Sequence, residues 1–137
     1  MMSASSLIAV AIGGATGSVG RYWLAHQVNL LMGFGGFAWG TFTVNTIGGF
    51  AIGFILIALQ EWLQADPTWR SLLVIGFLGG FTTFSSFSWD TYTLWMDGKT
   101  GLAVLNVLAN VSFSLVGTAL GVFLARWILP ISENIAR

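Results

Sequence analysis

Residues 76–88 of this chain read Gly76-Phe77-Leu78-Gly79-Gly80-Phe81-Thr82-Thr83-Phe84-Ser85-Ser86-Phe87-Ser88 and lie within a hydrophobic segment. The glycine pair and the two threonines have low helix propensity. In a bilayer a backbone group without a hydrogen-bond partner is costly, so irregular backbone is tolerated at membrane depth only where it lines a cavity or binds an ion. We therefore predict a membrane helix that is broken at Gly79 and Gly80, at mid-membrane, for a functional reason.

The composition indicates an integral membrane protein. Of 137 residues, 55% are hydrophobic and 7% are charged, and the mean hydropathy is +0.82. A soluble domain carries about 25% charged residues. The formal net charge is zero and no basic cluster occurs, which excludes a nucleic-acid partner. The chain has no Cys and a single His, which excludes disulfides and metal sites built from Cys or His.

Four segments have the roughly 20 apolar residues that a membrane-spanning helix needs. They cover approximately 5–27, 41–63, 71–95 and 102–129. Six of the seven Trp lie near the ends of these segments, as in the aromatic belts of membrane proteins. The first segment lacks a positively charged start and a cleavage site, so we expect it to be retained. The sequence thus predicts a single all-α membrane domain with four transmembrane helices per subunit, surrounded by lipid.

The positive charges give little orientation bias. Four spans would put Arg70, Arg126 and Arg137 on one side of the membrane, and Arg21 and Lys99 on the other. A difference this small does not set one topology by the positive-inside rule. Insertion in both orientations would explain it, and so would chance in a chain with few charges. The charge count alone leaves both explanations open.

Glycines recur at helical spacing in the first two predicted spans, at Gly13, Gly17, Gly20, Gly49 and Gly53. Ridges of small residues let helices approach closely. The partner of each ridge is either a helix of the same subunit or a helix of a second copy. Because four short spans enclose a water-lined pathway poorly, we expect a homo-oligomer.

The polar residues of the predicted spans are almost all neutral hydrogen-bonding groups. Asp90 is the most deeply placed carboxylate, one turn before the end of the third span. Arg21 lies near one end of the first span, where its side chain either snorkels to lipid headgroups or serves transport. Hydroxyls and amides with an Arg near the mouth favour an anion over a cation. The sequence has no hydrolase, zinc-protease or P-loop motif, so we expect no enzyme.

Asn45 and two phenylalanines are the strongest candidates for contact with a transported ion. A buried amide such as that of Asn45 needs several hydrogen-bond partners. It therefore either lines a pathway, which we favour, or joins neighbouring helices. Phe84 and Phe87 share one helix face. Their rings either pack against protein or lipid, or turn their positive edges toward an anion.

Three motifs give the chain a family resemblance. They cover 13–22 in the first predicted span, 40–50 in the second and 76–88 in the third. The third contains the specific string Gly-Gly-x-Thr-Thr-Phe-Ser-x-Phe-Ser, which begins at Gly79. In this order the motifs resemble those of the CrcB/Fluc fluoride channels, small bacterial membrane proteins that export fluoride passively. The resemblance extends over almost the whole chain.

This resemblance implies an antiparallel, dual-topology homodimer in the cell inner membrane or plasma membrane, with two fluoride pathways along the subunit interface. It also implies a structural sodium ion on the dimer axis, held by the backbone carbonyls of Gly79 and Thr82 from both subunits. Matching the motifs residue by residue assigns the fluoride pathway to Asn45, Thr83, Phe84, Phe87, Ser114 and Arg21. Ser112 is the alternative to Ser114. Asp90 stands where the family often has Glu, which leaves the role of this carboxylate open.

Two other functions suit a small four-span protein. A small dual-topology multidrug transporter couples protons to cationic drugs through an embedded carboxylate, whereas the first span here has Arg21 and no acid. The hypothesis of a non-transporting assembly subunit does not explain the embedded Asn45 or the broken third span. The sequence therefore predicts a passive, fluoride-selective channel, with the multidrug transporter as the alternative.

Overall fold

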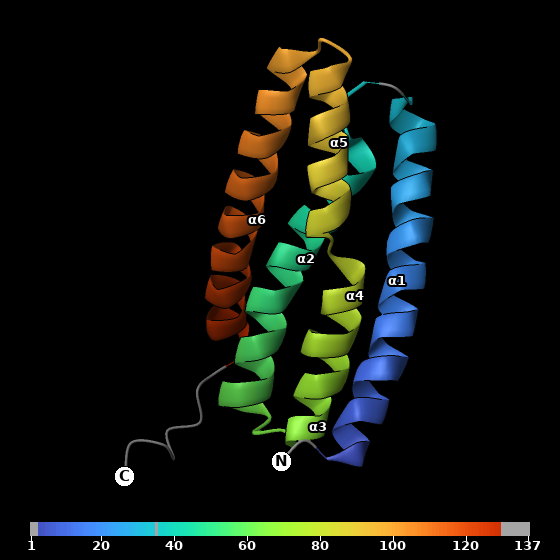
Figure 1. The fold of residues 1–137 in the computed structure, drawn as a ribbon. Helices are drawn as coiled ribbons and strands as arrows, with labels where there is room; N and C mark the ends of the chain where they lie inside the picture. Colours follow the sequence, from blue (N-terminus) through green and yellow to red (C-terminus); the bar gives the residue numbers. More distant parts are fainter. Residues whose placement is uncertain (1–2, 35, 130–137) are drawn as a thin grey trace.

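The computed structural model describes residues 3–34 and 36–129, and every regular element within them is a helix. In chain order these are α1 (Ala4–Met32), α2 (Trp39–Ile57), the π-helix η1 (Ala58–Trp62), α3 (Pro67–Arg70), the π-helix η2 (Ser71–Leu78), α4 (Gly79–Phe81), α5 (Phe84–Met96) and α6 (Thr100–Ile128). α1 runs along the molecule, α2 returns beside it, the run from α3 to α5 goes back, and α6 returns again (Figure 1). The prediction of an all-α protein is confirmed for the described residues.

Three helical runs in the described part of the chain are long and apolar enough to cross a membrane: Trp39–Trp62, Pro67–Met96 and Thr100–Ile128. They overlap the segments predicted at 41–63, 71–95 and 102–129. α1 contains the segment predicted at 5–27 and has 29 residues, but it is not one of these three runs. Polar residues such as Arg21, His26 and Asn29 lower its hydropathy. A membrane span at α1 stays a prediction.

Glycines on α1 bring this helix against η2. A Cβ on Gly13 would overlap the carbonyl oxygen of Leu72, and a Cβ on Gly17 would overlap that of Phe77. Only residues without a side chain allow two backbones to approach this closely. This ridge of α1 therefore packs within the subunit.

The same kind of contact joins α2 to α6. A Cβ on Gly49 would lie 2.6 Å from the carbonyl oxygen of Ser114, and a Cβ on Gly53 would overlap that of Thr118. The Thr118 hydroxyl also donates a hydrogen bond to the Gly49 carbonyl at 2.9 Å. Of the two partners considered for these glycines, the structure supports a helix of the same subunit. A homo-oligomer must therefore use other contacts.

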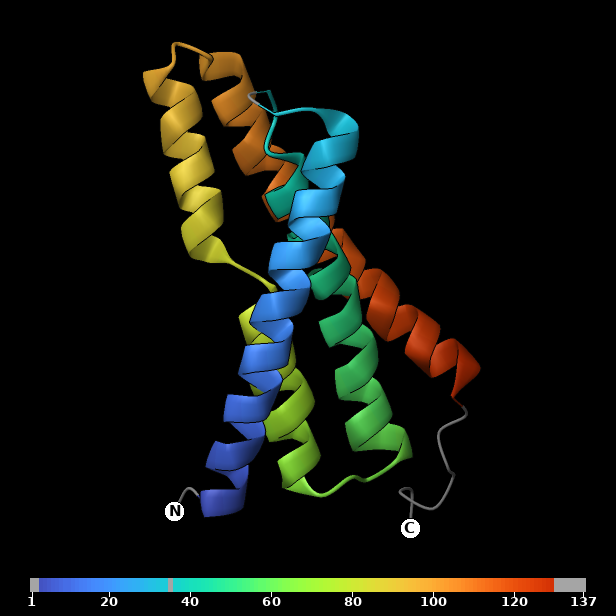
Figure 2. The same cartoon turned by 90° about the vertical axis from the view of Figure 1, so that its right-hand side faces the viewer.

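The backbone is extended between α4 and α5. α4 ends at Phe81, and Thr82 and Thr83 have φ/ψ values of −79°/158° and −151°/118°. α5 begins at Phe84, and the Thr83 hydroxyl caps it by accepting a hydrogen bond from the Ser86 amide at 3.1 Å. Figure 2 shows the two helices displaced from one another and joined by this link.

The prediction that the helix is interrupted at Gly79 and Gly80 is wrong in its position. Both glycines belong to α4, and Gly79 has helical φ/ψ values of −64°/−35°. Gly80 serves packing, because a Cβ there would lie 2.5 Å from the carbonyl oxygen of Gly14 on α1. Threonine is a favoured N-cap residue, so the interruption falls at Thr82 and Thr83, directly before the new helix.

An exposed ion pair joins the C-terminal ends of η1 and α6. Arg126 donates to both carboxylate oxygens of Glu61, at 2.7 and 3.2 Å. In the turn before α3, hydrogen bonds from the side chain and the amide of Thr68 lower the pKa of Asp66. These groups do not line the site described below.

Candidate functional site

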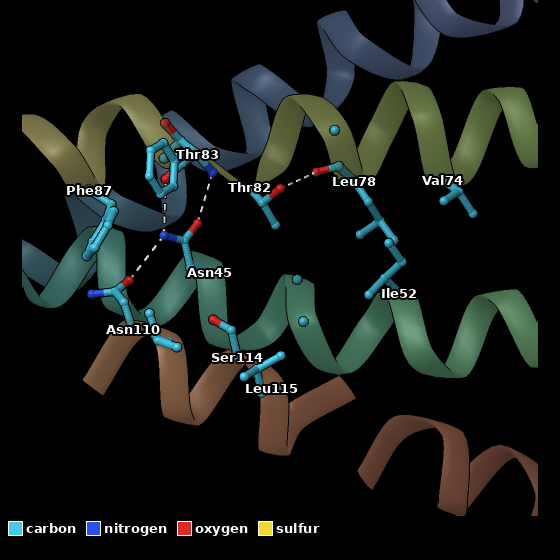
Figure 3. A pocket seen from close by; sticks show the side chains of 15 residues that line it. Asn45, Ile52, Val74, Leu78, Thr82, Thr83, Phe87, Asn110, Ser114 and Leu115 are labelled. Carbon is cyan, nitrogen blue, oxygen red and sulfur yellow. Dashed lines mark hydrogen bonds between the residues drawn. The ribbon is translucent and has the colours of Figure 1, made fainter. Parts of the chain in front are cut away.

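A cavity of ≈ 490 Å³ lies beside the link between α4 and α5, and residues of α2, η2, α5 and α6 form its other walls. We call it the Asn45 cavity. Figure 3 shows its lining, none of which is ionisable. The lining residues are Asn45, Gly48, Gly49, Ile52, Val74, Leu78, Gly79, Thr82, Thr83, Phe84, Phe87, Asn110, Val111, Ser114 and Leu115.

Asn45 replaces the helix hydrogen bonds that are missing at Thr83. Its Oδ1 accepts from the Thr83 amide at 2.9 Å, and its Nδ2 donates to the Thr83 carbonyl at 3.1 Å. The second Nδ2 hydrogen is directed to Asn110 Oδ1, also at 3.1 Å (Figure 3). Asn45 thus lines the cavity and also joins three segments. Contact with a transported ion stays a prediction for this residue.

Two carbonyls at the end of α4 lose the donors that a continuous helix would supply. In an α-helix the amide of residue i donates to the carbonyl of residue i−4. Here the Thr83 amide donates to Asn45, and the Ser86 amide donates to the Thr83 hydroxyl. The carbonyls of Gly79 and Thr82 would be the acceptors of these two amides in an unbroken helix. Gly79 and Thr82 both line the Asn45 cavity.

The hydrogen bonds of Asn45 continue into α6 through residues that the family motifs do not include. Asn110, which lines the cavity, donates from Nδ2 to Asn106 Oδ1 at 3.0 Å. Asn106 and Asn110 are 0% and 4% exposed, so losing these contacts would leave buried polar groups unpaired. With Ser114 they recur every four residues on α6. That spacing, which puts all three on one helix face, is the signal in the sequence that points to Asn110.

Phe84, Phe87 and Ser114 also lie at the cavity, as the motif match requires of pathway residues. The two phenyl rings have centroids 5.4 Å apart and are tilted by 50°. Phe84 is 79% exposed, so the cavity opens at the surface of the subunit beside this ring. Ser112 is exposed and does not line the cavity, whereas Ser114 does. The structure therefore favours Ser114 over Ser112 for a role at this cavity.

A second cavity of ≈ 230 Å³ includes Thr41 and Asp90 in its lining, and we call it the Asp90 cavity. Thr41, one turn before Asn45 on α2, donates its hydroxyl to Asp90 Oδ2 at 2.5 Å. Asp97 and Lys99, 3.5 Å apart, also line the Asp90 cavity. Arg21 lies on α1 and lines neither cavity. The structure therefore does not bring Arg21 together with the other predicted pathway residues of the same subunit.

The comparisons with known proteins agree on one family. A family model described as CrcB-like protein, Camphor Resistance (CrcB), matches residues 8–122. A relative from Geobacter sulfurreducens named "Fluoride-specific ion channel FluC" is 48% identical over 122 residues, which cover 89% of this chain and 98% of the relative. A relative of the same name from Solibacter usitatus is 44% identical over 117 residues, which cover 85% and 95%. The chain belongs to the CrcB family.

Proposed function

We propose that the chain forms a fluoride-selective channel that lets fluoride leave the cell passively and so lowers cytoplasmic fluoride. One observation carries the proposal. The Asn45 cavity is neutral and furnished with amides and hydroxyls, in a multi-pass membrane protein whose relatives are named fluoride-specific ion channels. The channel acts in the cell inner membrane or plasma membrane.

The chemistry of the Asn45 cavity suits a small anion. Fluoride is strongly hydrated, so a pathway must replace its water with hydrogen-bond donors. The side chains of Asn45, Thr83 and Ser114 carry such donors. The lining has no full positive charge, so an anion is held weakly enough to move on. The positive ring edges of Phe84 and Phe87 add attraction without a formal charge.

The conducting unit in this proposal is an antiparallel homodimer of four-span subunits that insert in both orientations. α1 supplies the fourth span, because its 29 residues extend about 44 Å at ~1.5 Å per residue, more than the ~30 Å of hydrocarbon. α1 also exposes large apolar side chains, among them Ile12 and Val19. A second copy covers the exposed Phe84 and closes the open side of the cavity. Arg21 attracts the anion toward the mouth of the pathway.

The direct test is anion efflux from liposomes that contain the purified protein. Fluoride should leave down its gradient, and chloride should leave at least about 100-fold more slowly, because a narrow path of donors fits the larger halide badly. A fluoride electrode and a chloride electrode measure the two rates on the same preparation. Protein-free liposomes are the control.

Equal fluoride and chloride rates would contradict the proposal. Proton-driven uptake of a cationic drug without fluoride release would instead indicate the multidrug transporter. The fifteen lining residues of the Asn45 cavity contain no carboxylate that would couple protons to such a substrate. The non-transporting subunit predicts no flux of either kind.

We also propose that each dimer holds a structural sodium ion at the ends of the two α4 helices. Carbonyl oxygens are hard ligands that suit an alkali cation. The proposal is supported by the carbonyls of Gly79 and Thr82. The amides that these carbonyls would accept from in an unbroken helix donate instead to Asn45 and to the Thr83 hydroxyl. Sodium would give these carbonyls a partner in both copies and tie the copies together. A water or a neighbouring hydroxyl is the alternative partner.

Removal of sodium should lower fluoride efflux by about ten-fold or more and destabilise the dimer, because the carbonyls then lack a partner in a low-dielectric setting. The measurement replaces sodium by N-methyl-D-glucamine on both sides of the liposome and follows efflux and dimer melting. Thr82→Val is the variant that separates the side chain of Thr82 from its backbone carbonyl. It keeps the carbonyl and removes only a hydroxyl that donates to the Leu78 carbonyl at 2.9 Å. Efflux and melting that do not respond to sodium would contradict the proposed site.

A further inference from the structure

We infer that Thr91 and Asn106 are positioning residues, which act through Asn110 to set the direction in which Asn45 presents its amide. The four side chains form one hydrogen-bonded row from the middle of α5, through α6, to α2. The inference rests on the proposed function, because it assigns the row to the passage of fluoride past Asn45. Thr91 and Asn106 line neither cavity and so act only through their neighbours.

The row has a defined direction at its α5 end. The Thr91 hydroxyl donates its hydrogen to the Phe87 carbonyl at 2.8 Å. Its oxygen is therefore left as an acceptor, and it accepts from Asn106 Nδ2 at 2.8 Å. An amide has one donor end and one acceptor end. Thr91 thus distinguishes the two ends of the Asn106 side chain and holds the nitrogen toward α5.

The direction is passed along α6. With its nitrogen at Thr91, Asn106 turns Oδ1 toward Asn110 and accepts from Asn110 Nδ2 at 3.0 Å. Asn110 then turns its own Oδ1 toward Asn45 and accepts from Asn45 Nδ2 at 3.1 Å. Reversal of either amide would put two nitrogens face to face. Because Asn106 and Asn110 are almost fully buried, such a mismatch would leave buried polar groups unpaired, which is costly.

The other end of the row requires the same direction. The Thr83 amide is a donor and the Thr83 carbonyl an acceptor, and they fix Asn45 with Oδ1 toward one and Nδ2 toward the other. Both hydrogens of Asn45 Nδ2 are therefore committed within the protein. An anion beside Asn45 must take one of them over. One of these hydrogens is donated to Asn110 Oδ1. The orientation of that acceptor depends on Thr91 and Asn106.

Loss of the Thr91 oxygen should disturb Asn45 without unfolding the protein. The effect is limited because Asn110 Nδ2 also donates to the Asn106 backbone carbonyl at 3.0 Å. This contact keeps part of the preference of the Asn110 amide for its present orientation. We therefore expect Thr91→Val to lower fluoride efflux by about three- to ten-fold, the range that one buried hydrogen bond spans as an equilibrium factor. Thr91→Ser keeps the oxygen and should restore efflux to within about two-fold of the unchanged protein.

Thr16→Val is the matched control. Thr16 lies on α1, and its hydroxyl also donates to carbonyls of its own helix, at 2.9 and 3.0 Å. The substitution is the same, but no side-chain amide donates to Thr16 in the structure of the described residues. Efflux through Thr16→Val should stay within about two-fold of the unchanged protein, since only a backbone contact within one helix is lost.

A second readout is independent of transport. The chain has five Asn, and selective 15N-Asn labelling gives a small set of side-chain amide signals in detergent. The signals of Asn45, identified by their loss in Asn45→Asp, should shift in Thr91→Val and stay in place in Thr91→Ser and Thr16→Val. Size-exclusion chromatography checks that each variant assembles, and Thr91→Ala replaces Thr91→Val if the latter does not.

The outcomes separate the two claims. If the unchanged protein releases no fluoride, the proposed function fails, while the amide signals still report whether the row exists. If the unchanged protein conducts and Thr91→Val matches Thr16→Val in efflux, the role of Thr91 and Asn106 in transport is overturned. A fall in efflux with unshifted Asn45 signals also overturns it, because Thr91 would then act by another route.

Discussion

Asn45→Asp should lower fluoride efflux by about 100-fold or more. A carboxylate at this position still offers an oxygen to the Thr83 amide, so the link between α4 and α5 keeps one of its contacts. The variant loses both Nδ2 donors, to the Thr83 carbonyl and to Asn110 Oδ1, and turns oxygen against oxygen there. Two like charges ~4 Å apart at an effective dielectric constant of 20 repel by about 4 kcal/mol, which exceeds the energy of a 100-fold change.

The measurement is fluoride efflux from liposomes, with assembly of the proposed dimer checked by size-exclusion chromatography. Asn29→Asp is the matched control. Asn29 Oδ1 accepts from the Gly40 amide at 2.9 Å, and an aspartate keeps that contact. We expect Asn29→Asp to conduct within about five-fold of the unchanged protein, since Asn29 lines the Asp90 cavity and not the Asn45 cavity of the proposed pathway. Unchanged efflux in Asn45→Asp would mean that Asn45 only joins helices.

Gly53→Ala should destabilise the subunit by about 3 kcal/mol or prevent it from folding, at the upper end of the effect of overpacking. The new Cβ would overlap the carbonyl oxygen of Thr118, which belongs to the backbone of α6. A backbone atom cannot turn aside as a flexible side chain does, so α2 and α6 must separate. Separation would also open the wall of the Asn45 cavity that Gly49 and Ser114 form.

The test compares Gly53→Ala with Gly101→Ala. Gly101 lies at the start of α6, and a Cβ there would meet nothing within 4 Å. Alanine is a better helix former than glycine by up to about 1 kcal/mol, so Gly101→Ala should leave stability unchanged or raise it slightly. Reversible unfolding in mixed detergent micelles gives the free energies. Equal stability of the two variants would show that the packing of α2 against α6 does not require the close backbone approach at Gly53.

Much of the candidate site follows from local patterns in the sequence. The motif match names Asn45, Thr83, Phe84, Phe87 and Ser114, and the structure brings all five to one cavity. Arg21 is the exception, because it lies on α1 and lines neither cavity. In the proposed homodimer, its position relative to a pathway would depend on the second copy of the chain, which local sequence does not describe.

Asn110 and Asn106 illustrate what local patterns leave open. Their four-residue spacing shows that they share a helix face with Ser114, but not what that face meets. The contact between Asn45 and Asn110 joins residues 65 positions apart. It exists because glycines bring α2 and α6 together, and it could be found only once the two helices were placed side by side.

The sequence by itself determined the membrane class, the helical character and the family, because apolar composition, residue spacing and motif order are local properties. It also indicated an irregular segment between Gly76 and Ser88. Only the tertiary structure decided that Gly79 and Gly80 stay helical while Thr82 and Thr83 are extended. Close packing requires glycine at position 80. An amide side chain from another helix satisfies the backbone at Thr83, and the Thr83 hydroxyl caps α5 by accepting from the Ser86 amide. Such choices depend on which segments meet, and that is a property of the packed chain.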